Sequence, residues 1–121
     1  MTAGRNSTAI AMAYKRGDVV LVPFPFADAK ATKTRPALVV SAPGYESETG
    51  NLIIAQITSQ APKFSSDYPL KDWKEAGLLK PSIVRLKLAT LAASLVRYRP
   101  GRLSSDDLTE VDTRLRTVLG L

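Results

Sequence analysis

The sequence predicts a small, mainly β fold that ends in a single helix. Three short apolar segments rich in β-branched residues, at positions 19–22, 36–41 and 51–57, are separated by polar or turn-forming stretches. This pattern is typical of neighbouring antiparallel strands. Near the end of the chain, apolar residues recur instead at helical spacing. We therefore expect about five strands in a small β-barrel, closed or braced by a C-terminal helix.

Turn-forming and polar residues mark the connections between these segments. Pro23 and Pro25 follow the first segment, and proline cannot donate the hydrogen bond that a central strand needs. Residues 27–34, ADAKATKT, are polar and predict a loop. Residues 42–50, APGYESETG, are rich in turn-forming residues and predict an irregular connection.

The middle of the chain gives weaker signals. A short strand can form within residues 64–70. Residues 72–77 begin with aspartate and end with glycine, which favours a single helical turn. Residues 82–96 are apolar enough for two short strands or for a strand and a turn, and the sequence PGR at 100–102 predicts a break.

The C-terminal segment carries the clearest helix signal. Ser104, followed three residues later by Asp107, matches a capping box at a helix start. Gly120 is expected to end the helix. The apolar face of this helix is predicted to comprise Leu108, Val111, Leu115 and Val118.

Composition restricts the chemistry that the chain can perform. Its 121 residues suit one domain, which we expect over residues 14–121 after a flexible arm at residues 1–13. Cysteine and histidine are both absent, which excludes disulfides, thiol nucleophiles and the usual general base at neutral pH. Acidic residues are scattered and no glycine-rich phosphate loop is present, so no metal or other cofactor is expected.

The charge balance favours a polyanionic partner. Seventeen Lys and Arg residues stand against 11 Asp and Glu residues, a net charge of +6. Charge alone does not separate a nucleic-acid-binding protein from an ordinary basic one. No apolar run is long enough to span a membrane, and the first residues lack the apolar core of a secretory signal. A cytoplasmic location is therefore expected.

Two polar groups lie at the ends of predicted strands. Arg35 precedes Pro36, which favours an extended backbone at the arginine and so fixes where its side chain projects. A guanidinium offers a planar set of donors that matches phosphate oxygens. The second group is residues 56–60, QITSQ, where amides and hydroxyls follow an apolar strand. Taken alone, the first group is more typical of a surface salt bridge and the second of a turn.

Taken in order, these motifs resemble those of the MazF/PemK-type toxins. The matching segments are GDVVLVPFPF, KTRPALVVS, a strand ending in ITSQ, LLKPSIVR and GRLSSDDLTEV. Together they extend over residues 16–121. Gyrase poisons of the CcdB type share this fold, but the RP and ITS motifs indicate the ribonuclease branch.

The resemblance implies an SH3-like β-barrel, usually a homodimer, that binds RNA in a groove at the dimer interface. It also implies that Arg35 and Thr58 are catalytic. The RNA 2′-hydroxyl attacks the neighbouring phosphate and leaves a 2′,3′-cyclic phosphate and a 5′-hydroxyl, a reaction that needs no metal. Because arginine hardly ever deprotonates, we assign Arg35 first to stabilising charge on the phosphoryl oxygens. Thr58 donates its hydroxyl or positions the 2′-hydroxyl.

The residue that accepts the proton from the 2′-hydroxyl is not identified. Some relatives carry a glutamate in the loop before the arginine, where this sequence has only Asp28 as an acid, so Asp28 is the one candidate acid or base. Others carry an aspartate shortly after the arginine that Arg85 matches; it has no counterpart here, and Lys87 stands nearby. The residues expected to bind substrate are Phe24, Lys33, Thr34, Ser59, Gln60, Arg85 and Lys87.

Two alternative functions stay open. The first is a non-catalytic basic barrel that only grips nucleic acid through Arg35 and Thr58. The second is a CcdB-like poison that acts on a topoisomerase by protein–protein contact. For partners, the resemblance implies single-stranded RNA, a second copy of the chain, and an antitoxin whose acidic disordered tail folds across the basic groove.

Overall fold

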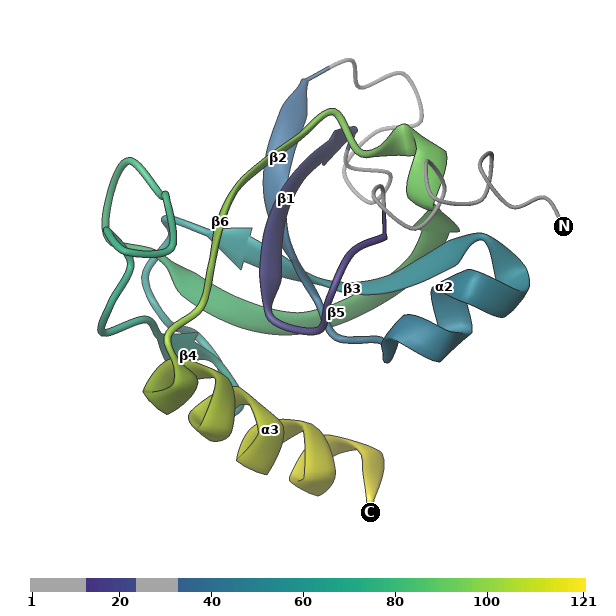
Figure 1. Ribbon diagram of the computed structural model, residues 1–121. Coiled ribbons are helices and arrows are strands. Elements are labelled where there is room, and N and C mark those ends of the chain that lie inside the picture. Colours follow the sequence, from purple (N-terminus) through teal and green to yellow (C-terminus); the bar gives the residue numbers. More distant parts are fainter. Residues whose placement is uncertain (1–12, 24–32) are drawn as a thin grey trace, which may run out of the picture.

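The computed structural model describes residues 13–23 and 33–121, and these form one curved antiparallel sheet with a long helix across one side (Figure 1). The sheet has six strands in the order β4-β5-β3-β2-β1-β6. The strands are β1 (Asp18–Pro23), β2 (Thr34–Val39), β3 (Asn51–Thr58), β4 (Tyr68–Pro69), β5 (Ile83–Ala92) and β6 (Tyr98–Arg102). The helices are α2 (Pro43–Thr49), the 3-10 turn η1 (Ala93–Leu95) and α3 (Ser105–Leu119). The mainly β fold with a C-terminal helix is confirmed.

The three strands predicted from apolar segments are present and pair antiparallel. Val19 of β1 lies opposite Leu38 of β2, and Leu38 lies opposite Ala55 of β3. Strand β2 begins at Thr34, before the predicted start, because Arg35 pairs with Val22 of β1. The arginine is therefore part of the sheet and not of the preceding loop.

The connection at residues 42–50 is a short helix, so the prediction of an irregular turn was wrong. Pro43 stands in the first turn of α2, where its missing N–H is not needed. Gly50 ends the helix with φ of 74°, the left-handed conformation that glycine adopts without strain. Glu46 of α2 accepts a 2.8 Å hydrogen bond from the backbone N–H of Tyr14. The turn-forming residues thus mark the two ends of a helix.

Residues 82–102 contain two strands, and the break predicted at PGR was wrong. Strand β5 is continuous, and a register shift between Ala55 and Gln56 of its partner β3 lets it curve. Strand β6 runs through Pro100 and pairs with β1 at one edge of the sheet. An edge strand tolerates proline because one of its sides has no ladder to satisfy.

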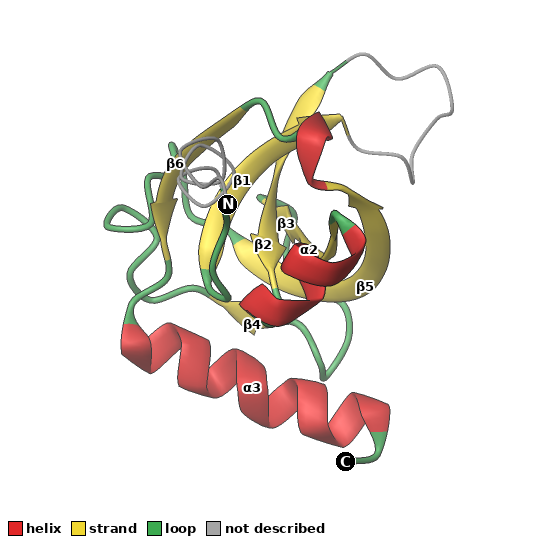
Figure 2. Ribbon diagram, turned by 45° about the vertical axis from the view of Figure 1, so that its right-hand side comes forward, coloured by secondary structure: helices red, strands yellow, loops and turns green. Residues whose placement is uncertain are grey.

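Helix α3 begins and ends where the sequence predicts. The Oγ of Ser104 accepts a 3.2 Å hydrogen bond from the backbone N–H of Asp107, and Gly120 has φ of 73°. Val111 and Leu115 are buried, but Val118 is 49% exposed, so its assignment to the core face was wrong. Figure 2 shows α3 running beneath the curved sheet, and its last turn exposes apolar side chains instead of burying them.

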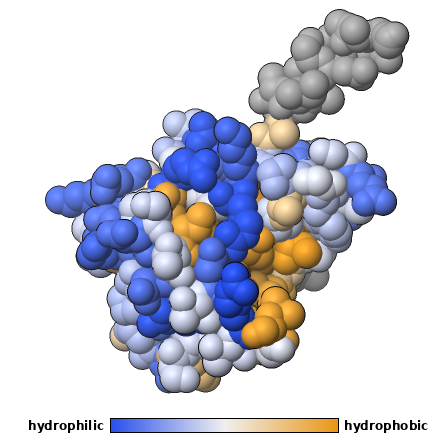
Figure 3. Space-filling view, turned by 60° about the horizontal axis from the view of Figure 1, so that its bottom comes forward, coloured by the Kyte–Doolittle hydropathy of each residue, from blue (hydrophilic) through white to orange (hydrophobic). Residues whose placement is uncertain are grey.

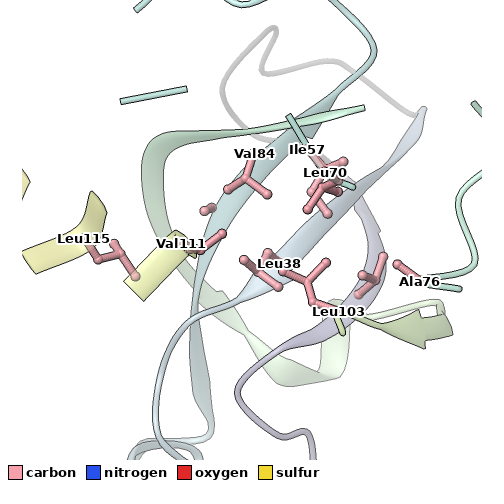
Figure 4. Close-up of a cluster of buried hydrophobic side chains, with 10 residues drawn as sticks. Leu38, Ile57, Leu70, Ala76, Val84, Leu103, Val111 and Leu115 are labelled. Atoms are coloured by element: carbon pink, nitrogen blue, oxygen red, sulfur yellow. The ribbon is translucent and has the colours of Figure 1, made fainter. Parts of the chain in front are cut away.

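Two apolar clusters cover the two faces of the sheet. One packs sheet residues such as Leu38 and Val84 against Val111 and Leu115 of α3 (Figure 4). The other lies on the opposite face and comprises Val20, Val22, Ala37, Val39, Leu52, Ile54 and Leu91. Side chains alternate between the faces along each strand, so neighbouring residues serve different clusters. Among the described residues, no helix is long and apolar enough to cross a membrane.

Candidate functional site

A cavity of about 470 Å³ opens beside the ends of β2 and β3. Arg35 and Thr58 both line it, as do Thr34 and Ser59. One wall is formed by strands β1, β2, β3 and β6, and the other by the segment 77–82. The two residues that sequence reasoning singled out as catalytic therefore share one cavity.

The sheet register explains why Arg35 and Thr58 lie at the same cavity. Ala37 of β2 pairs with Gln56 of β3. Arg35 precedes Ala37 by two residues and Thr58 follows Gln56 by two, so in an antiparallel pair both project from the same end and on the same side. The Oγ1 of Thr58 accepts a 3.2 Å hydrogen bond from the backbone N–H of Gln60, which leaves its O–H free to donate elsewhere. Arg35 is exposed to solvent.

Much of the wall of this first cavity is apolar. Leu21 of β1 pairs with Pro36 on one side and with Tyr98 of β6 on the other, and all three residues line the cavity. Leu79, on the opposite wall, is 96% exposed. Arg35 therefore stands at the solvent-exposed end of a cavity whose lining is otherwise largely apolar.

Gly77 and Gly101 allow a close approach between the turn that leads into segment 77–82 and strand β6. A Cβ on Gly77 would lie 2.6 Å from the backbone oxygen of Pro100, and a Cβ on Gly101 would lie 2.7 Å from that of Ala76. Only glycine therefore allows the turn at residues 72–77 to pack on β6 this closely.

A second cavity of about 570 Å³ adjoins the first. Gln56 lines both cavities, which places them side by side along β3. The second is lined by Gln56, Gln60, Lys63, Phe64, Ser66, Arg85, Leu86 and Lys87. Three of the residues expected to bind substrate, Gln60, Arg85 and Lys87, thus lie here and not beside Arg35.

Arg85 is bound to Asp67 through two donors. Its Nε lies 3.1 Å from Oδ1 and its Nη2 lies 2.8 Å from Oδ2. The Asp67 side chain is fully buried and that of Arg85 is 12% exposed. The hydrogen bond from Arg85 lowers the pKa of Asp67 to about 2 against the opposing effect of burial, so this carboxylate stays charged.

Of the remaining predicted residues, the structure describes only Lys33. Lys33 is exposed and is not among the residues that line either cavity. Phe24 and Asp28 lie outside the described residues, as does the predicted arm at residues 1–13 apart from Ala13. Within residues 13–23 and 33–121, no aspartate or glutamate lines either cavity, and no group of three potential metal ligands occurs.

Comparison with known proteins identifies the family. The family model for PemK-like, MazF-like toxins of type II toxin–antitoxin systems matches residues 15–119. This chain belongs to that toxin family. No match was found among curated proteins.

Solved structures of MazF-like proteins share the fold of this toxin-family chain. An endoribonuclease from a mycobacterial species, solved with its cognate antitoxin, has a TM-score of 0.73 at 18% identity, over 90% of this chain and 97% of that one. MazF from Deinococcus radiodurans, solved with MazE, has a TM-score of 0.68 at 26% identity, over 90% of this chain and 98% of that one.

The sequence alone did not indicate what surrounds the motif residues. Asp67 was grouped with scattered acids, although it binds Arg85, and Phe64 was assigned only to a short strand. Tyr98, which lines the first cavity, was not singled out, and the segment 77–82 entered only through the LLKPSIVR motif, with no role in the site assigned to it. The missing information is tertiary: Asp67 and Arg85 are 18 residues apart, and no local pattern links them.

Proposed function

We propose that this chain is a metal-independent endoribonuclease that cuts single-stranded RNA at the first cavity and so inhibits translation and growth. The observation that carries the proposal is that Arg35 and Thr58, from different strands, line one cavity with apolar walls. Membership of the toxin family supports the same reading.

The hydrogen-bond donors that line this cavity suit a reaction in which the RNA attacks its own phosphodiester backbone. The 2′-hydroxyl attacks the adjacent phosphorus, the bond to the 5′-oxygen breaks, and the products are a 2′,3′-cyclic phosphate and a 5′-hydroxyl. Negative charge grows on the phosphoryl oxygens, and Arg35 stabilises it with N–H donors that stay protonated. Thr58 donates its hydroxyl to the same phosphate or holds the 2′-hydroxyl in place. The nucleophile comes from the substrate, so no metal-bound water is required.

One observation favours a second candidate, a barrel that binds nucleic acid without cutting it. None of the described residues that line the two cavities carries a carboxylate to accept the proton. Asp28, in the segment before Arg35, is the acid or base that we propose for a catalytic site.

The deciding experiment is cleavage of a long single-stranded RNA in EDTA by the wild-type chain and by the Arg35→Ala and Thr58→Ala variants. We expect discrete cuts with cyclic phosphate ends for the wild type and their loss in both variants. Arg116→Ala, which removes an exposed cation of α3 that lines neither cavity, serves as the control and should retain cutting. Intact RNA with retained binding would establish the non-catalytic barrel, and loss of binding altogether would favour a topoisomerase poison.

The partners and location follow from the same proposal. A basic surface attracts an acidic antitoxin tail by charge steering, and the tail would fold as it covers the cavities. The structures solved with MazE or another cognate antitoxin support such a partner. We further propose a homodimer of chains, each with one domain at residues 14–121, in the cytoplasm where RNA is available.

A further inference from the structure

The second cavity contains an aromatic ring that no part of the cleavage reaction uses. Phe64 lines this cavity and is 58% exposed, so its ring is within reach of a ligand that enters there. It stands in the segment between β3 and β4, close in sequence to Thr58, which lines the first cavity. The exposed ring therefore lies next to the proposed cleavage site.

One face of the Phe64 ring is covered by a cation. The guanidinium carbon of Arg85 lies 5.3 Å from the ring centroid, within the range of a cation–π contact. Because the ring is still mostly exposed, its other face is open to the cavity. A ring supported from behind and open in front is the geometry that stacks on a flat ligand.

Buried contacts hold this pair in place before any ligand arrives. Asp67 accepts hydrogen bonds from the backbone N–H groups of Lys63, at 2.8 Å, and of Phe64, at 3.1 Å, through the same oxygen that binds Arg85. Nη1 of Arg85 donates to Oε1 of Gln60 at 3.0 Å. The backbone that carries the ring and the guanidinium behind it are thus fixed by one carboxylate.

The lining beside the ring offers amides that suit the edge of a base, together with the cations Lys63 and Lys87, which suit the phosphate of the same nucleotide. The charge of Arg85 is already balanced by Asp67, so this arginine adds little attraction for an anion. Gln56 and Gln60 bring amide groups to the lining, and the NH2 of Gln60 can donate to the edge of a base. Unpaired bases of RNA are read by this combination of stacking and polar contacts to their edges.

We propose that the second cavity is a nucleobase subsite, in which an unpaired base beside the scissile phosphate stacks on Phe64 while Asp67 positions Arg85 behind the ring. The proposal rests on the proposed function for the identity of the ligand as single-stranded RNA. Gln56 lines both cavities, so the base bound here belongs to a nucleotide next to the one held by Arg35 and Thr58. Phe64 is then a residue that determines which sequences are cut.

The first test measures binding without cleavage. Short single-stranded oligonucleotides carrying 2′-O-methyl groups cannot be cut, and their affinity is read by fluorescence anisotropy for the wild type, Phe64→Ala and Phe64→Trp. We expect Phe64→Ala to weaken binding on the order of 10-fold, and Phe64→Trp to retain it, since any aromatic ring can stack. The slope of affinity against salt should not change, because no phosphate contact is lost. Leu121→Ala removes another exposed apolar side chain, far from both cavities in sequence, and is the control.

The second test reads the cut sites. Sequencing of the 5′-hydroxyl ends from a mixed RNA pool should show that Phe64→Ala loses base preference at one position beside the cut. If the wild type cuts but Phe64→Ala retains both its affinity and its cut pattern, the subsite is refuted and the proposed function stands. If the wild type binds but never cuts, the proposed function fails, and the binding comparison still decides the role of Phe64.

Discussion

The carboxylate of Asp107, in the first turn of α3, accepts a 2.6 Å hydrogen bond from the hydroxyl of Tyr68 in β4. Asp107 is fully buried and also accepts hydrogen bonds from the backbone N–H groups of Lys71 and Asp72. Burial, reinforced by Asp107, raises the pKa of the Tyr68 hydroxyl. This one side chain therefore ties the C-terminal helix to the turn that leads into the wall of the first cavity.

Replacing Asp107 should destabilise the fold severely. Asp107→Ala leaves the Tyr68 hydroxyl and two backbone N–H groups without their partner, which we expect to cost about 3 kcal/mol or more in the free energy of unfolding. Asp106→Ala is the matched control, because its exposed ion pair with Lys71 should contribute less than about 1 kcal/mol. Urea denaturation measures both, and similar midpoints for the two variants would contradict the anchoring role of Asp107.

Acid should weaken the fold through Asp67. Its pKa in the folded chain is about 2, below the ordinary value of 3.8, so its contribution to stability is complete above the ordinary value. That contribution is lost as the pH falls from about 4 to about 2, and it amounts to about 2 kcal/mol. The free energy of unfolding, measured across this range, should fall less steeply in Asp67→Asn than in the wild type. Glu48→Gln, at an exposed position of α2, should follow the wild-type curve.

Arg35→Lys should impair cleavage although it keeps the positive charge. Lysine lacks the planar set of donors that can contact two phosphoryl oxygens together, so we expect the cleavage rate to fall on the order of 100-fold. Arg116→Lys makes the same exchange at an exposed position of α3 and should have no effect. Rates are compared on one RNA at saturating enzyme, and a fully active Arg35→Lys enzyme would show that charge alone is sufficient.

Gly101→Ala should disturb the first cavity. The added Cβ would lie 2.7 Å from the backbone oxygen of Ala76, and backbone cannot move aside as a side chain can. We expect a loss of about 1–3 kcal/mol in stability and a slower cleavage reaction, as the segment 77–82 is pushed away from β6. Gly44→Ala is the control: nothing lies within 4 Å of its Cβ, and alanine within α2 should stabilise by about 0.5–1 kcal/mol. Thermal melting and cleavage rates test the pair.

Sequence patterns predicted the helices and strands whose formation depends mainly on residues close together in the chain. Ser104 and Gly120 bound the helix whatever it packs on, and the apolar runs of β1, β2 and β3 pair as expected. The sequence did not predict β6, because this strand forms by pairing with β1, which is distant in the chain. Arg102 of β6 lies opposite Asp18 of β1, 84 residues away. A proline and a glycine that would break a strand in isolation are accepted there at the edge of a sheet.

The same division applies to the candidate site. Arg35 and Thr58 stand at strand ends in recognisable motifs, so their proposed roles came from the sequence through the family resemblance. The sequence did not show which cavity each of the other candidate residues lines. Packing decides, for example, whether Arg85 faces a ligand or Asp67. Val118 shows the opposite case: helical spacing placed it on the apolar face of α3, but it stays half-exposed among the residues that the structure describes.

The position of β1 in the sheet has a consequence during synthesis of the chain. One edge of β1 pairs with β2, which is made soon afterwards, but the other edge pairs with β6, and nearby Arg16 binds Asp112, 96 residues later. While the ribosome is still making the intervening residues, the growing chain has no Tyr98 wall and no α3 to close its core. The first cavity is therefore assembled only near the end of translation, and chains released early from a damaged message lack it.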